Sequence, residues 1–259
     1  MVENHRLRVR YLGGPTALVE IGGLRFLTDP TFDPAGAYTS GPRTLTKTQD
    51  AVVTPDALGP IDAVLLSHDQ HMDNLDRSGR ELLAKVPLTL STVSAQVRLG
   101  GTVRVLPNWE SVELPRPDGG SLRITGVPAQ HGPDGSEPYV GEVTGFVLAG
   151  TGLPSVYVSG DNASLDVVRA IADRLGPFDV SLLFAGAAKT ALLDGALLTL
   201  GSEQAAEAAK MLGTGPVIVL HFEGWAHFSQ GAATVRGAFA QAGLSDRLHL
   251  PRLGEEIEL

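Results

Sequence analysis

The segment that most constrains the fold is Ser-His-Asp-Gln-His-Met-Asp-Asn at residues 67–74, which directly follows the apolar run at residues 61–66. Its histidines and aspartates supply imidazole nitrogen and carboxylate oxygen, the ligands that Zn²⁺, Mn²⁺ and Fe²⁺ take in proteins. A loop that leaves a buried strand can direct several such side chains at one point. The segment therefore predicts a metal site at the end of a strand.

The apolar segments on either side of this loop predict a mixed α/β protein. Short segments at residues 7–12, 17–21 and 24–28 are separated by glycine-containing turns and predict an antiparallel meander. A long polar loop is predicted over residues 29–60. Residues 75–86 predict a helix because their apolar side chains can share one face, so the histidine loop joins a strand to a helix.

The remaining segments add further strands and then alternate between helix and strand. Strands are predicted at residues 88–90, 103–106, 121–127, 143–148 and 155–159. Ser164 is expected to cap a helix at residues 165–175, and Ser202 a helix at residues 203–212. Strands at residues 180–184 and 217–220 and a helix at residues 232–242 complete the pattern. We expect two stacked sheets covered on their outer faces by helices.

Composition restricts the classes of partner. The 259 residues are 43% hydrophobic and show no compositional break, so we expect one domain over residues 1–259. A net charge of −9 argues against a nucleic-acid or anionic-membrane surface. No apolar stretch approaches the roughly 20 residues of a membrane span, and a cytoplasmic protein is expected. Aromatic residues in the loops would suit a homo-oligomer. Because the chain has no cysteine, a metal must be bound by nitrogen and oxygen ligands.

Candidate ligands recur at the ends of four predicted strands. A single histidine at a strand end is more often hydrogen-bonded than metal-bound, so none of them carries the prediction alone. Their recurrence favours one site at one edge of the sheets, where side chains from distant parts of the sequence meet. The four groups are His68, His71, Asp73 and Asn74; His131; Asp161; and His221.

The order of these residues resembles that of the metallo-β-lactamase superfamily. The superfamily pattern is a strand followed by His-x-His-x-Asp-His, then a lone histidine, an aspartate in a Gly-Asp loop and a strand-terminal histidine. The chain looks like the L-ascorbate-6-phosphate-lactonase-like branch, because Thr28-Asp29-Pro30 and Pro128-Ala129-Gln130-His131 match two further features of that branch. The resemblance covers about residues 12–242 and implies an α/β fold, a four-layer αβ/βα sandwich of two mixed β-sheets flanked by helices.

The chain departs from the family motif at two positions. His68 and His71 are three residues apart, whereas the first two motif histidines are two apart. Either the segment carries a one-residue insertion, or Asp69 takes the first ligand position; we favour the insertion, because Val-Leu-Leu-Ser-His copies the family's junction of strand and ligand. Asn74 stands in place of the last motif histidine.

The resemblance implies a centre of two divalent ions. His68, His71 and His131 would hold one ion, Asp73 and His221 the other, with Asp161 bridging them and Asn74 as a weak ligand of the second. Zn²⁺ is the first expectation, with Mn²⁺ or Fe²⁺ as alternatives and a weaker second site. Two ions about 3.5–4 Å apart would share and activate a water molecule, and Asp73 would orient it and accept its proton.

Other polar and aromatic residues are candidates for the surroundings of the centre. His227 could protonate a leaving group, serve as a ligand or cap the last helix. Trp225 could form an apolar wall of the pocket or belong to the core. Lys189 and Arg43 could bind an anionic group of the substrate, although solvated basic side chains are common. Asp29 is expected to support the site from behind a ligand.

Three classes of function follow. The first is a metal-dependent hydrolase of a small-molecule ester, lactone, amide or phosphoester. The second is a nuclease or phosphodiesterase, which the acidic composition opposes. The third is a non-catalytic metal-binding module, in which the altered spacing and Asn74 have ended catalysis.

Overall fold

Two seven-stranded mixed sheets form the centre of the molecule. The computed structural model describes residues 6–40 and 43–259, without the side chains of Ser40 and Arg43. The first sheet is antiparallel from β16 to β3 and parallel from β3 to β8. Its strands, in spatial order, are β16 (Glu256–Glu258), β1 (Arg8–Gly13), β2 (Thr16–Ile21), β3 (Leu24–Thr28), β6 (Ala63–Leu65), β7 (Thr89–Ser91) and β8 (Val103–Val105).

The second sheet also has an antiparallel part and a parallel part, and its parallel part consists of the strands that come later in the sequence. It is parallel from β15 to β12 and antiparallel from β12 to β9. Its strands, in spatial order, are β15 (Leu248–His249), β14 (Val217–Leu220), β13 (Val180–Phe184), β12 (Val156–Val158), β11 (Thr144–Ala149), β10 (Ser121–Pro128) and β9 (Ser111–Pro115).

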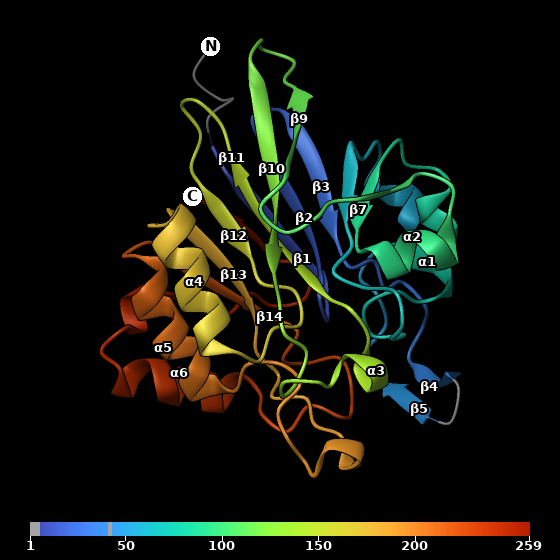
Figure 1. Ribbon diagram of the computed structural model, residues 1–259, viewed down its shortest axis with the longest axis vertical. Coiled ribbons are helices and arrows are strands. Elements are labelled where there is room, and N and C mark those ends of the chain that lie inside the picture. The colour runs from blue at the N-terminus through green and yellow to red at the C-terminus, as the bar shows by residue number, and fades with distance from the viewer. Residues whose placement is uncertain (1–5, 41–42) are drawn as a thin grey trace.

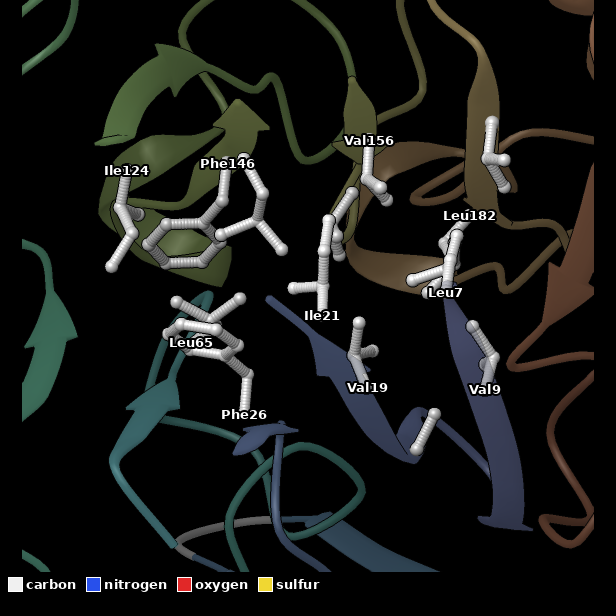
Figure 2. Close-up of a cluster of buried hydrophobic side chains, with 14 of the residues drawn as sticks. Leu7, Val9, Val19, Ile21, Phe26, Leu65, Ile124, Phe146, Val156 and Leu182 are labelled. Carbon is white, nitrogen blue, oxygen red and sulfur yellow. The ribbon is translucent and has the colours of Figure 1, made fainter. Parts of the chain in front are cut away.

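The two sheets face each other across the main hydrophobic core. Side chains such as Val19 and Phe26 from the first sheet meet Phe146 and Leu182 from the second, and all four are at most 1% exposed (Figure 2). Removal of this apolar surface from water is what chiefly holds the sheets together. The core therefore lies between the sheets and away from the strand ends.

Helices cover the outer face of each sheet (Figure 1). The helices α4 (Leu165–Leu175), α5 (Ser202–Leu212) and α6 (Ala232–Gln241) pack on the second sheet through a separate apolar cluster. Helix α1 (Arg77–Leu83) packs on the first sheet through Leu82 and Leu83, with α2 (Val93–Leu99) beside it. The predicted four-layer αβ/βα sandwich is confirmed.

The local predictions hold best where the sequence is strongly periodic. Strands β3, β13 and β14 and helix α4 begin and end at the predicted residues, and Ser164 caps α4 by accepting a hydrogen bond from the Val167 amide. Ser202 is the first residue of α5 and not its cap, a position that Gly201 takes. None of the helices within the described residues is long and apolar enough to cross a membrane.

The predicted loop at residues 29–60 contains structure that the sequence did not indicate. A hairpin of β4 (Gly36–Ser40) and β5 (Arg43–Lys47) and a 3-10 turn at Pro55–Leu58 lie within it. The hairpin strands are mostly polar, so they lack the apolar alternation on which strand prediction depends. The hairpin and the short helix α3 (Glu137–Val140), which was also not predicted, lie at the same end of the molecule (Figure 1).

Candidate metal centre

Three of the predicted ligands converge at the carboxyl ends of strands from both sheets. Nε2 of His68 lies 3.1 Å from Nδ1 of His71, and Nε2 of His131 lies 3.3 Å from the same atom. Nitrogens bound about 2.0–2.1 Å from one tetrahedral ion stand roughly 3.3 Å apart. These three side chains form a group with ligand atoms within 4.8 Å of one another, and their spacing matches that of ligands around a single ion.

Hydrogen bonds on the far side of two of these rings fix their tautomers. Nδ1 of His131 lies 2.7 Å from the carbonyl oxygen of Leu198, which can only accept, so this nitrogen carries the proton. Nδ1 of His68 lies 2.9 Å from the Ser67 hydroxyl, whose own proton is donated to Asp29. Both Nε2 atoms therefore present lone pairs to the centre of the group, as metal ligation requires.

Protein hydrogen bonds alone do not satisfy these lone pairs. The two Nε2 acceptors both face Nδ1 of His71, which carries at most one hydrogen. Burial holds the pKa of His68 well below its usual value, even though nearby Asp161 acts in the opposite direction. The imidazole of His68 is fully buried and neutral, and its lone pair is directed at the rings of His71 and His131, an arrangement that suits a divalent cation. The residues present therefore fit the metal that the resemblance implies.

The first ligand is supported by a buried acid. Asp29 accepts hydrogen bonds from the Ser67 amide at 2.6 Å and from its hydroxyl at 2.7 Å, and Ser67 in turn contacts His68. Burial raises the pKa of Asp29 to about 7, against the lowering effect of these bonds. This arrangement agrees with the supporting role expected of Asp29 and names Ser67 as the group through which it acts.

A second group of acids and histidines adjoins the three imidazoles. Oδ2 of Asp73 lies 3.1 Å from Nε2 of His227 and 3.5 Å from Nε2 of His221. Asp161 stands between the two groups, because its Oδ1 is 3.5 Å from Nε2 of His221 and its Oδ2 is 4.0 Å from Nε2 of His68. The bridging position predicted for Asp161 is compatible with this geometry.

The charges in the second group favour a cation. Burial acts to raise the pKa of Asp161 and of Asp73, but the neighbouring histidines, His221 among them, hold both well below the usual value. Burial would lower the pKa of His221, but Asp161 and Asp73 raise it to about 10. Two buried carboxylates thus need a positive charge beside them, which either an imidazolium or a metal ion supplies.

Asn74 contacts two acids of the site through its side-chain amide nitrogen. Nδ2 lies 3.3 Å from Oδ2 of Asp29 and 3.3 Å from Oδ1 of Asp161, and an amide N–H between two carboxylates is a donor without a lone pair for a metal. Its Oδ1, the atom predicted to bind the second ion, is buried and has no hydrogen-bond partner among the described residues. Asn74 therefore holds two acids of the site together in this structure.

Asp69 points away from the three imidazoles. Its carboxylate pairs with the guanidinium of Arg98 on α2, and Nε of Arg98 donates to it at 2.9 Å. Since His68 occupies the inner position, the structure favours the insertion at Asp69-Gln70 over a ligand role for Asp69. The extra residue lets the chain pair one buried acid with Arg98 while His68 and His71 both face the centre.

Two residues of the site, the predicted ligand His221 and the supporting acid Asp29, have a left-handed backbone conformation. His221 has φ 54° and Asp29 has φ 27°, conformations that residues other than glycine rarely adopt. The amide of His221 donates to the carbonyl oxygen of Gly14 at 2.8 Å, and this bond keeps the chain in that turn. Such conformations cost on the order of 1 kcal/mol and persist at sites where the surroundings impose them.

A cavity of about 900 Å³ opens onto the polar groups. His68 and His221 are fully buried and do not line it, so they lie behind the residues that do. A reactant in the cavity would meet most of the other predicted ligands directly, but not the side chains of His68 and His221. Five of the predicted ligands and proton carriers form part of its wall: His71, Asp73, His131, Asp161 and His227.

The predicted substrate-binding residues are placed differently from one another. Lys189 lines the cavity. Trp225 does not; its side chain is 3% exposed, with the ammonium of Lys47 5.7 Å from the centre of its ring. An isolated antiparallel β-bridge between the backbones of Lys47 and Trp225 joins the β4–β5 hairpin to the loop that bears His227. The backbone of Arg43 begins β5, but its side chain lies outside the part of the chain that the structure describes.

Comparisons with known proteins identify relatives of this chain. Residues 24–222 match the β-lactamase superfamily domain. The chain is 30% identical over 195 residues to the N-acyl-phosphatidylethanolamine-hydrolyzing phospholipase D 1 of Caenorhabditis elegans, covering 68% of this chain but only 53% of that protein. It is 24% identical over 259 residues to a UPF0173 metal-dependent hydrolase of Pyrococcus abyssi, covering 98% of this chain and 100% of that protein.

The fold is also similar to solved structures. An isothiocyanate hydrolase from Delia radicum gut bacteria superposes with a TM-score of 0.81 at 23% identity, over 96% of this chain and 98% of that one. At this identity the likeness concerns the fold alone, and the lactonase-like branch stays a prediction. The match over residues 24–222 extends across most of both sheets and every predicted ligand, and it shows that this chain belongs to the metallo-β-lactamase superfamily of metal-dependent hydrolases.

Proposed function

We propose that this protein hydrolyses a small-molecule ester, lactone or phosphoester with a water molecule activated at the metal centre. The observation that carries the proposal is the convergence of three imidazole side chains beside Asp161, at the wall of a large cavity. A divalent ion held there supplies Lewis acidity and a water nucleophile that is active near neutral pH. No side chain in the cavity is needed as a nucleophile.

The proposed centre holds two ions, with Zn²⁺ as the first choice and Mn²⁺ or Fe²⁺ as alternatives. His68, His71 and His131 would hold the first, and Asp73 and His221 the second, with Asp161 between them. Support for a cation in the second position comes from the two buried carboxylates that flank His221. Asn74 offers only a neutral oxygen, so binding there should be weaker.

Asp73 and His227 are the proposed proton carriers. The contact of 3.1 Å between Oδ2 of Asp73 and Nε2 of His227 orients the His227 ring, which also lines the cavity. Asp73 would accept a proton from the attacking water, and His227 would deliver one to the leaving group. Lys189, on the same wall, has no ion pair among the described residues and would bind an anionic group of the substrate.

The relatives do not select one substrate, since their names refer to a phospholipid and to an isothiocyanate. A panel of esters, lactones and phosphodiesters, assayed with chelator-treated protein reloaded with Zn²⁺ or Mn²⁺, tests the proposal. Turnover should require metal, and His131→Ala should lower kcat at least about 100-fold. His249→Ala, which changes a histidine outside the centre, should match wild type. Absence of turnover across the panel by fully loaded protein would reject the proposal.

A further inference from the structure

Two large hydrophobic side chains that are exposed to solvent line the cavity. Tyr139 and Leu192 are each 61% exposed and both line it. Two more, Val93 and Val97, lie on α2 and do not line the cavity. Val52 is also exposed and does not line the cavity either.

The exposed residues continue an apolar wall that reaches the metal centre. Leu45 and Pro138 also line the mouth, and we call Leu45, Pro138, Tyr139 and Leu192 the apolar rim. Below the rim, the wall includes Val140, Ala188 and Leu198, which pack together as a small buried cluster. The carbonyl of Leu198 accepts the hydrogen bond of His131, so the apolar wall ends at a predicted ligand.

The rim is held by short, well-anchored segments. Tyr139 lies on α3, where the amides of Tyr139 and Val140 donate to the carbonyl of Ser136. Leu192 lies on a 3-10 turn, and its amide donates to the Thr190 hydroxyl at 3.3 Å. Exposed apolar groups fixed in this way are placed to cover an apolar ligand, because removing them from water stabilises the complex.

We propose that the substrate carries an acyl or alkyl chain that lies along the apolar rim while its scissile group reaches the metal centre. This inference depends on the proposed hydrolysis for its scissile group. The cavity volume of about 900 Å³ is far larger than a two-carbon acyl group needs, and an apolar wall runs from its mouth to His131. Lys189 on the same wall would bind an anionic group at the polar end of such a molecule.

Chain-length dependence of turnover tests the inference. With Zn²⁺-loaded protein and p-nitrophenyl esters from acetyl to decanoyl, kcat/KM should rise about two- to fourfold for each methylene that contacts the rim. The double variant Tyr139→Ser/Leu192→Ser should lower the decanoyl-to-acetyl ratio of kcat/KM at least about fivefold. Val52→Ser should leave that ratio unchanged. Equal kcat/KM along the series, or an unchanged ratio in the double variant, would overturn the inference.

A binding measurement separates this inference from the proposed hydrolysis. Decanoate and acetate share the carboxylate, so the difference in their affinities, measured by calorimetry on Zn²⁺-loaded protein, reports on the chain alone. Decanoate should bind at least about tenfold more tightly, and the double variant should lose most of the difference. Such binding without any turnover would reject the hydrolase but uphold the chain site. Equal affinities would reject the chain site.

Discussion

Nδ2 of Asn74 lies 3.3 Å from Oδ1 of Asp161, so the residue that replaces the last motif histidine donates to the carboxylate predicted to bridge two ions. The same amide group lies 3.3 Å from Asp29, which supports His68 through Ser67. Asn74 thus connects the acid behind the first ligand to the acid between the two groups. Its replacement should disturb the position of Asp161 without removing a ligand of the first ion.

Asp161→Ala and Asn74→Ala should therefore differ in metal content. Loss of Asp161 removes the carboxylate that faces both groups, and we expect metal to be lost from both positions. Loss of Asn74 should chiefly weaken the second position, because His68, His71 and His131 stay in place. Plasma-emission metal analysis after Zn²⁺ loading and dialysis measures both. Wild-type metal content in Asp161→Ala would contradict the bridging assignment.

Ser67→Ala should weaken the first ion without touching a ligand. The hydroxyl connects Asp29 to His68 and fixes the tautomer that leaves Nε2 free to bind metal. Removal of such a supporting hydrogen bond typically lowers metal affinity about 10–100-fold. Competition with a chromophoric chelator gives the Zn²⁺ affinity directly. Ser155→Ala, which removes a hydroxyl bonded to Asp179 in an exposed pair, is the matched control and should bind as wild type does.

Asp69→Asn separates the two interpretations of the altered histidine spacing. If the segment carries an insertion, Asp69 serves only to pair with Arg98, so the variant should keep its metal and lose about 1–3 kcal/mol of stability. His68→Ala should abolish tight binding of the first ion. Metal affinity and urea unfolding of the two variants decide between the interpretations. A variant Asp69→Asn that binds metal as poorly as His68→Ala would make Asp69 the ligand.

The convergence of the site was predictable because each ligand follows a strong local signal. An apolar strand precedes His68, Asp161 and His221. The strands before Asp161 and His221 are both in the parallel part of the second sheet, so their carboxyl ends lie at one edge, whereas the strand before His68 belongs to the first sheet. The strands with continuous apolar runs, such as β13 and β14, were also predicted at the observed residues. Local periodicity is informative here because the sheet centre is buried on both faces.

The supporting contacts could not be predicted because they join residues that are distant in sequence. Arg98 reaches Asp69 across 29 positions, and Ser67 reaches Asp29 across 38. The Leu198 carbonyl that orients His131 is a backbone atom and leaves no side-chain signal at all. Trp225 was a candidate for the pocket wall, but the docking of the β4–β5 hairpin, itself not predicted, covers its indole.

The buried acid Asp29 should make the metal-free protein sensitive to pH. Its pKa is about 7 in the folded protein against an ordinary value of 3.8, so the folded state holds a proton that the unfolded state releases between these values. The resulting stability is fully present below about pH 3.8 and is lost as the pH rises through 7. Asp29→Asn keeps a neutral side chain and should lose this dependence.

Urea unfolding of chelator-treated wild type and Asp29→Asn at pH 5 and pH 8 measures the effect. From pH 5 to pH 8 the free energy of unfolding of the wild type should fall by about 2–3 kcal/mol relative to that of the variant. The reason is that Asp29 is ionised throughout this range in the unfolded chain but only in its upper part in the folded protein. Asp246→Asn, at an exposed aspartate, should follow the wild type. Parallel pH profiles for wild type and Asp29→Asn would show that the folded protein ionises Asp29 as readily as the unfolded chain does. Zn²⁺ should reduce the difference, because a cation near Ser67 and His68 stabilises the ionised acid.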